Sequence, residues 1–352
     1  MEKIVRIDDV KEALRHVMDP ELGADLVSLD MIRNIAVKGN TIAFDLVLTT
    51  PACPLKKVMS DNCREAIARY ISPDYEVEIN LTSAKPQAHA TDLQQLSKVR
   101  HIIAVASGKG GVGKSTVAAN LALALAKGGN KVALVDADIY GPSIPTMFGL
   151  EEVQPQGVQE GDKTLLLPVE KYGIKLISIG FFVDTDKGLL WRGPMASNAL
   201  RQLFTETRWE EIDYMVVDLP PGTGDIHITI AQMLPVSGVV MVCGPQQVAV
   251  ADVKRAAQMF QSVRIPILGL VENMAYFVPD DMPEKKYYIF GKEAFAAYAA
   301  QTGFPVLAEI PMTESAARSG DAGTPEVLRG EGPVSQAFMN LAQKIMEARS
   351  CR

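Results

Sequence analysis

The residues best suited to chemistry lie in one short segment, residues 108–116, which reads GKGGVGKST. Its first glycine and its Gly113-Lys114-Ser115 end satisfy the pattern GxxxxGK[ST] of a phosphate-binding loop. Glycines in such a loop let several backbone N–H groups converge on phosphate oxygens at the positive end of the following helix. The segment therefore predicts a nucleotide site.

Two flanking elements support this prediction. Residues 101–107 (HIIAVAS) form a short β-branched run that is typical of a buried parallel strand. Residues 116–127 (TVAANLALALAK) are rich in alanine and leucine, which favour a helix, and Gly128 follows as a stop signal. The sequence thus predicts the order strand, glycine loop, helix that a phosphate site requires.

Each position of the loop has an expected role. The Lys114 ammonium group can neutralise β- and γ-phosphate charge, and the Ser115 hydroxyl can ligate Mg²⁺. A second lysine, Lys109, stands directly after the first glycine. We expect the nucleotide to be held by Gly108, Lys109, Gly110, Gly111, Val112, Gly113, Lys114, Ser115 and Thr116.

Three aspartates at predicted strand ends complete the expected site. Asp136 and Asp138 end the run KVALVDAD, and Asp218 ends the run YMVVD. Ligand groups of open α/β sheets gather at such carboxyl ends of strands. We expect Asp218 to organise the Mg²⁺ water shell, Asp138 to orient the attacking water and Asp136 to support the metal, although the last two roles could be exchanged. A single aspartate at a strand end is more often a helix cap or a turn residue, so the prediction depends on all three.

Composition excludes several classes of protein. The 352 residues carry a net charge of −7 at pH 7, which argues against nonspecific binding to nucleic acid. The apolar runs are too short to cross a membrane and the N-terminus MEKIVRIDDV lacks a secretory signal, so we expect no membrane partner and a cytoplasmic location. No CxxC pair occurs, which excludes a disulfide framework and a local zinc ribbon.

A small α/β domain is predicted over residues 1–82. Asp8 or Asp9 can cap a first amphipathic helix. Strand patterns and a second helix follow, with strands expected at 32–37, 41–48 and 75–81 and the helix at 55–70.

A polar segment without hydrophobic periodicity, residues 83–99, predicts a linker to a larger domain over residues 100–352. Strand and helix patterns alternate there, which is typical of a doubly wound parallel sheet. Further strands are expected at 131–135, 214–217, 239–242 and 267–271. The predicted fold class is therefore α/β, a P-loop NTPase sheet with a small N-terminal α/β domain.

Longer motifs resemble one known family over nearly the whole chain. From residue 108 onward, GKGGVGKST, DADIYGPSIP, WRGPMAS, DYMVVDLPPGTGD, PQQVAVADV and VENMAYF occur in this order. Together they resemble the Mrp/ApbC-type iron–sulfur cluster carriers, which belong to the deviant Walker A group with the septum-site and chromosome-partitioning ATPases. Residues 1–82, with MDPEL and TTPACP, look like the metal–sulfur assembly domain often fused ahead of such an ATPase.

The resemblance implies a homodimer with ATP held between two subunits. Lys109 would then reach the phosphates bound by the other subunit and offset charge as the γ-phosphate leaves. The alternative is a solvated lysine on a flexible loop. Asn273, in VENM, matches the asparagine that reads adenine in related ATPases, and the alternative there is a capping asparagine.

The sequence departs from the family pattern at the usual cluster site. Family members carry a CxxC pair shortly after the ENM segment, whereas residues 272–283 read ENMAYFVPDDMP, with Val278 and Asp281 where cysteines would stand. Neither side chain replaces a thiolate ligand of a cluster. Cys53, in TTPACP, is a candidate cluster ligand because a following helix would lower its thiol pKa, and the alternative is a small buried residue. Cys243 is expected to be a core residue.

The resemblance favours an ATP-dependent carrier or scaffold that hydrolyses ATP and, with assembly factors, assists delivery of iron–sulfur clusters to apo-proteins. Two alternatives remain. One is a partitioning-type ATPase on membrane or DNA, which the acidic balance and the weakly basic C-terminal segment disfavour. The other is a regulatory ATPase that acts on protein partners without its own cluster, which the missing CxxC pair keeps open.

Overall fold

The computed structural model divides into two compact units, Met1–Gln87 and Ala88–Arg352, each with its own hydrophobic core. The residues that the structure describes are 5–19, 24–29, 31–48, 56–83, 94–161, 163–182, 193–330 and 332–350. Among these residues, no helix is long and apolar enough to span a membrane.

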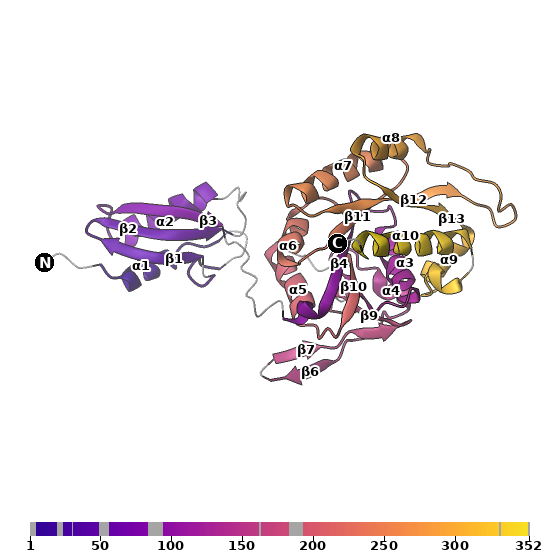
Figure 1. The fold of residues 1–352 in the computed structure, drawn as a ribbon. Coiled ribbons are helices and arrows are strands. Elements are labelled where there is room, and N and C mark those ends of the chain that lie inside the picture. Colours follow the sequence, from indigo (N-terminus) through magenta and orange to yellow (C-terminus); the bar gives the residue numbers. More distant parts are fainter. Residues whose placement is uncertain are drawn as a thin grey trace. The chain divides into compact units, whose positions relative to one another are not determined.

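The first unit packs two helices against a sheet that, over the described residues, has three strands in the order β1-β2-β3 (Figure 1). Strand β2 runs antiparallel to β1 and parallel to β3. Ile42, Phe44 and Leu46 alternate along β2 and are buried, as the period of a strand with one covered face requires. The elements are α1 (Ile7–Leu14), β1 (Ile32–Lys38), β2 (Thr41–Leu48), α2 (Lys56–Tyr70) and β3 (Glu76–Ser83).

The start of α1 differs from the prediction. Arg6 is the residue before the first helical turn, so Asp8 and Asp9 lie inside the turn and neither occupies the cap position itself. The Asp9 carboxylate still accepts a hydrogen bond from the Arg6 backbone N–H, at 2.9 Å. The prediction that Asp8 or Asp9 is the N-cap residue was wrong, because the helix already begins at Ile7. Asp9 contributes from the first turn instead, through its hydrogen bond with the N-cap backbone.

The second unit is built on a sheet of eight strands in the order β13-β12-β11-β4-β10-β5-β9-β8, counted over its described residues. All neighbouring strands are parallel except the edge pair β8 and β9. The strands are β4 (Val99–Ser107), β5 (Val132–Asp136), β8 (Val169–Lys171), β9 (Ile174–Ser178), β10 (Ile212–Asp218), β11 (Gly238–Cys243), β12 (Ile267–Phe277) and β13 (Val306–Met312). The predicted doubly wound sheet is confirmed, with one antiparallel edge strand added.

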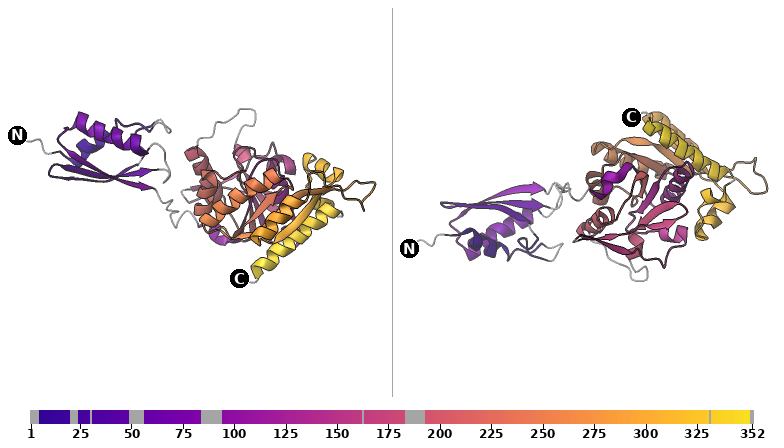
Figure 2. Two further views of the ribbon diagram at one scale, coloured as in Figure 1. Left: turned by 90° about the horizontal axis from the view of Figure 1, so that it is seen from above. Right: turned by 60° about the horizontal axis from the view of Figure 1, so that its bottom comes forward.

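Helices cover both faces of this sheet, with α5 to α8 on one side and α3, α4, α9 and α10 on the other (Figures 1 and 2). The helices are α3 (Lys114–Lys127), α4 (Ile144–Phe148), α5 (Gly193–Thr205), α6 (Asp225–Met233), α7 (Gln247–Ser262), α8 (Glu293–Thr302), α9 (Glu314–Asp321) and α10 (Pro333–Ser350). Short 3₁₀ turns are η1 (Gln95–Lys98), η2 (Ile179–Phe182) and η3 (Glu326–Arg329). A separate hairpin of β6 (Gly157–Glu160) and β7 (Lys163–Leu166) was not predicted.

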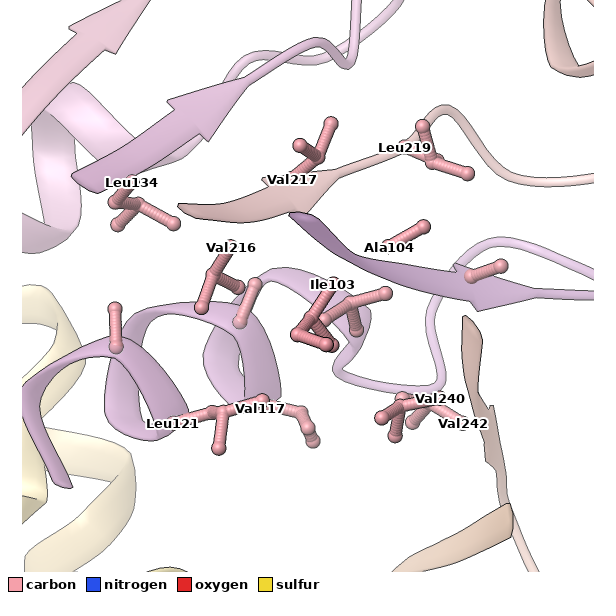
Figure 3. Packing of buried hydrophobic residues seen from close by; sticks show 14 of the residues in the cluster. Ile103, Ala104, Val117, Leu121, Leu134, Val216, Val217, Leu219, Val240 and Val242 are labelled. Atoms are coloured by element: carbon pink, nitrogen blue, oxygen red, sulfur yellow. The ribbon is translucent and has the colours of Figure 1, made fainter. Parts of the chain in front are cut away.

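Successive buried side chains of the central strands lie on opposite faces of the sheet. Figure 3 shows Ile103 and Val216 on the side of α3, and Ala104 and Val217 on the opposite side of the sheet. All four side chains are buried, and so are the apolar residues of α3 except Ala126, which is partly buried. Because both faces are covered, the strands read as continuous apolar runs, which is why the sequence located them well.

Candidate nucleotide site

The phosphate loop leaves the sheet at its middle. Strand β4 lies between β10 and β11, and residues 108–113 connect it to α3. Two of the glycines have left-handed backbones, Gly111 with φ +78° and Gly113 with φ +76°. Gly108 is constrained differently, since a Cβ atom there would lie 2.1 Å from the backbone carbon of Asp252 in α7. The loop therefore needs glycine at these positions for conformation and for space.

Asn273 supports the loop from β12. Its Nδ2 donates a hydrogen bond to the backbone carbonyl of Val112, at 2.9 Å, and its side chain is buried. The same amide lies so close to the loop that a Cβ on Gly113 would be 2.2 Å from Nδ2. The structure thus places Asn273 against the phosphate loop, and its expected role toward adenine stays a prediction.

A buried cluster of charges forms where three elements meet. The Lys114 ammonium group lies 2.5 Å from Oδ1 of Asp218 at the end of β10, and 3.4 Å from Oδ2 of Asp138 after β5. Lys114 and Asp138 are almost fully buried, and Asp218 is completely so. Since buried charges are costly unless paired, these residues need one another in the fold.

Asp136 is held differently from the other two aspartates. Its Oδ1 accepts the Asp138 N–H at 3.2 Å, and its Oδ2 accepts the Ile144 N–H at 3.2 Å and the Ser178 hydroxyl at 2.9 Å. Burial, together with the neighbouring charge of Asp218, raises the pKa of Asp136 to about 8. Burial also raises the pKa of Asp218, while the Lys114 ammonium opposes that rise. Burial and the neighbouring carboxyl groups therefore oppose the ionisation of Asp136 and Asp218, and Lys114 offsets only part of this effect.

The residues present fit a magnesium ion. Oδ2 of Asp218 is buried and, within the described residues, makes no hydrogen bond. The Ser115 hydroxyl lies 3.2 Å from the Lys114 ammonium, so it belongs to the same cluster. Carboxylate and hydroxyl oxygens are the donors that Mg²⁺ prefers, and a dication would favour the ionised form of these buried carboxyl groups.

His227, which the sequence did not single out for the site, holds the loop after Asp218. Its Nε2 lies 2.7 Å from the Pro220 carbonyl and its Nδ1 lies 3.3 Å from the Gly224 carbonyl. Burial lowers the pKa of His227, which favours the neutral ring, and the shorter contact identifies Nε2–H as the donor. The spacing of side chains along the sequence could not indicate this role of His227, because its partners are backbone carbonyls in a loop.

The other predicted site residues are less closely grouped. Lys109 is half-buried at the loop, where its backbone carbonyl accepts the Ser107 hydroxyl at 2.9 Å. Cys53 lies outside the described residues. Cys243 is buried at the end of β11, and burial raises the pKa of its thiol to about 12, as suits a core residue. Val278 is buried and Asp281 exposed, and the described residues hold no group of three or more His, Cys, Asp or Glu side chains that could bind a metal.

Comparison with known families decides which proteins this chain resembles. The family model described as NUBPL iron-transfer P-loop NTPase matches residues 98–346. This chain belongs to that family. A second model, iron-sulfur cluster assembly protein, matches residues 7–81. The resemblance found in the motifs is thereby confirmed for both parts of the chain.

Two curated relatives align with nearly the whole chain, and one solved structure aligns with 70% of it. An iron-sulfur cluster carrier protein of Synechocystis is 43% identical over 342 residues, 96% of either chain. Another, of Aquifex aeolicus, is 41% identical over 368 residues, covering 97% of this chain and 98% of the relative. A solved nucleotide-binding protein of Archaeoglobus fulgidus in complex with ADP is 36% identical with a TM-score of 0.60, covering 70% of this chain and 96% of its own.

Proposed function

We propose that this chain binds and hydrolyses ATP and carries iron–sulfur clusters to apo-proteins. The observation that carries the proposal is the coupling of two units in one chain. One unit has a phosphate loop beside a buried Lys114, Asp138 and Asp218 cluster, and the other matches cluster assembly proteins. Relatives named as iron-sulfur cluster carrier proteins align with almost the whole of this chain.

The residues of the site divide the ATPase work. Backbone N–H groups of residues 110–116 bind the phosphates at the start of α3, as in other phosphate loops. With ATP bound, Lys114 would contact the β- and γ-phosphates in place of Asp218. Ser115 and Asp218 would hold Mg²⁺, which would supply positive charge against the transferring phosphoryl group. Asp138 orients and polarises the attacking water, while Asp136 keeps the Asp138 backbone and the start of α4 in place.

Two copies are proposed to share this site. Lys109 stands at the entrance of the phosphate loop and, unlike Lys114, is only half-buried. A second ammonium group from the partner copy would stabilise charge that develops on the γ-phosphate, which is the role of an arginine finger in other NTPases. ATP binding would then favour the pairing of two copies, and the pairing would in turn complete the site that hydrolyses ATP.

The cluster is cargo in this proposal, and cysteine is its natural ligand. Cys63 and Cys243 are buried, and burial raises the pKa of each thiol to about 12, so neither is suited to exchange a cluster. Cys53 remains the candidate, contributed by two copies and completed by thiols from outside.

A regulatory ATPase without a cluster of its own is the second candidate. It is favoured by Val278, a buried valine where the motif resemblance leads us to expect a cysteine. The two candidates differ in one measurement: the iron and sulfide retained after anaerobic reconstitution. We expect wild type to retain iron and sulfide and Cys53→Ser to lose most of both, with Cys351→Ser as the matched control. Equal content in wild type and Cys53→Ser would remove Cys53 from the proposal, and no cluster in any form would favour the regulatory ATPase.

A further inference from the structure

Residues 219–224 form a loop between β10 and α6, which we call the proline loop. The backbone N–H of Gly222 donates to the carbonyl of Ser107, the last residue of β4, at 3.0 Å. The Cγ atom of Pro221 lies 4.0 Å from the position that a Cβ atom on Gly110 would occupy. The proline loop therefore lies against the phosphate loop, where we propose that the phosphates bind.

Two successive prolines, Pro220 and Pro221, leave the proline loop without a backbone N–H group at either position. Pro220 is buried, so its carbonyl needs a donor from another part of the chain. His227 supplies this donor, since its Nε2 lies 2.7 Å from the Pro220 oxygen. The Gly224 carbonyl differs, because it already accepts the backbone N–H of His227 at 3.0 Å. The ring thus holds the proline loop mainly at Pro220.

The direction of the His227 ring is fixed by its surroundings. The residue lies in the first turn of α6 and is only 2% exposed. The ring of Phe260, in α7, meets it edge-on, with the two ring centres 6.3 Å apart and the planes at 78°. A neutral ring that donates from Nε2 has no hydrogen left for the Gly224 carbonyl, 3.3 Å from Nδ1. One nitrogen therefore holds the loop, and packing determines where that nitrogen lies.

We propose that His227 is a positioning residue of the nucleotide site, which holds Asp218 and Pro221 in place through the Pro220 carbonyl. Pro220 is only two residues after Asp218, whose carboxylate lies 2.5 Å from the Lys114 ammonium. A buried carbonyl that loses its donor keeps its desolvation cost, so without the ring the loop would move to find another partner. This inference rests on the proposed nucleotide and Mg²⁺ site and adds the residue that orders it.

The first experiment separates the two ring nitrogens. His227→Gln places an amide N–H near the position of Nε2, His227→Asn places one near Nδ1, and His227→Phe keeps a ring without either. We expect His227→Phe and His227→Asn to lower kcat for ATP hydrolysis about tenfold, and His227→Gln to keep about half of it. His16→Phe, which changes an exposed histidine of the first unit, is the control and is expected to match wild type.

The measurements are phosphate release, the Kd for ATP without Mg²⁺, and thermal unfolding of each variant. We expect this Kd to change less than about twofold, because the phosphate loop keeps its own backbone donors. An unchanged kcat in His227→Phe would overturn the inference. Equal losses in His227→Gln and His227→Asn would also overturn it, even if His227→Phe does not fold, because they would show that packing of the ring matters and the Nε2 donor does not.

The second experiment does not depend on hydrolysis. It compares the Kd for ADP with and without Mg²⁺ by calorimetric titration. We expect Mg²⁺ to strengthen ADP binding in wild type and His227→Gln, and this gain to be at least about threefold smaller in His227→Phe, where Asp218 is no longer held. The same gain in wild type and His227→Phe, or none in wild type, would overturn the inference. Wild type that shows the gain but does not hydrolyse ATP would overturn the proposed ATPase alone.

Discussion

The side-chain amide of Asn273 donates to the backbone carbonyl of Val112, 2.9 Å away and 161 positions earlier in the chain. Both groups are buried, so this bond connects β12 to the middle of the phosphate loop. A buried carbonyl that loses its donor keeps its desolvation cost, which makes such a contact more important than an exposed hydrogen bond.

Asn273→Ala is expected to weaken nucleotide binding about fivefold to tenfold, since losing one buried hydrogen bond costs about 1 kcal/mol and loosens the loop. The measurement is the Kd for fluorescent ATP and GTP analogues. A role confined to the loop predicts equal losses for both bases. A loss restricted to ATP would show instead that Asn273 reads adenine.

Gly113→Ala and Gly111→Ala form a matched pair. Both positions have left-handed backbones, but only at Gly113 would the added Cβ collide with Asn273, whereas nothing lies within 4 Å of a Cβ at Gly111. We expect Gly113→Ala to abolish nucleotide binding and Gly111→Ala to weaken it through backbone strain of about 1 kcal/mol. Calorimetric titration with ATP and Mg²⁺ measures both. Equal losses would show that strain alone decides the effect.

The sequence predicted those parts of the site that depend on local pattern. A glycine loop between a buried strand and a helix, and aspartates directly after apolar strands, are consequences of order along the chain. This is why Lys114, Asp138 and Asp218 could be grouped before their geometry was known.

Contacts between distant positions could not be predicted in this way. The Asn273–Val112 bond and the Ser178–Asp136 bond depend on which strands become neighbours, and His227 acts through backbone carbonyls that no residue type reveals. The run Tyr287–Phe290 shows the same limit, because four apolar residues in a row resemble a buried strand. Only the fold shows them to be exposed.

A shared site predicts complementation between two inactive proteins. Lys109→Ala keeps its own Asp138 but lacks the lysine for its partner, and Asp138→Asn has the reverse defect. Each alone is expected to lose most ATP hydrolysis, and an equimolar mixture is expected to regain about a quarter of wild-type activity if copies pair at random. Phosphate release measures this result. Full activity of Lys109→Ala alone would exclude a role for Lys109 in the partner's site.

Glu272 provides a test of pH dependence. Its Oε1 is buried and, over the described chain, makes no hydrogen bond, and burial together with Glu309 raises its pKa to about 7. Cys243, its neighbour in β11, has a pKa raised to about 12 and stays neutral in this range. The folded state therefore binds a proton more tightly than the unfolded chain does, so stability decreases as the pH rises from about 4.5 to 7.

Glu272→Gln keeps the shape of the side chain and removes its charge. It is expected to flatten this pH dependence and to stabilise the protein by about 1 to 2 kcal/mol at pH 8, with little change at pH 4.5. Urea unfolding at several pH values measures the difference. The exposed Glu309→Gln serves as the control and is expected to change the slope less. Equal slopes for wild type and Glu272→Gln would contradict this assignment.

We propose that one molecule both uses ATP and delivers the cluster. The most direct measurement is the activation of an apo iron–sulfur enzyme by anaerobically reconstituted protein, with ATP and Mg²⁺ present or absent, for wild type and Asp138→Asn. We expect wild type to transfer the cluster at a rate that ATP changes, and we expect Asp138→Asn to lose this response to ATP while it still binds nucleotide. Transfer that is identical with and without ATP in both proteins, or no transfer by wild type, would contradict this proposal.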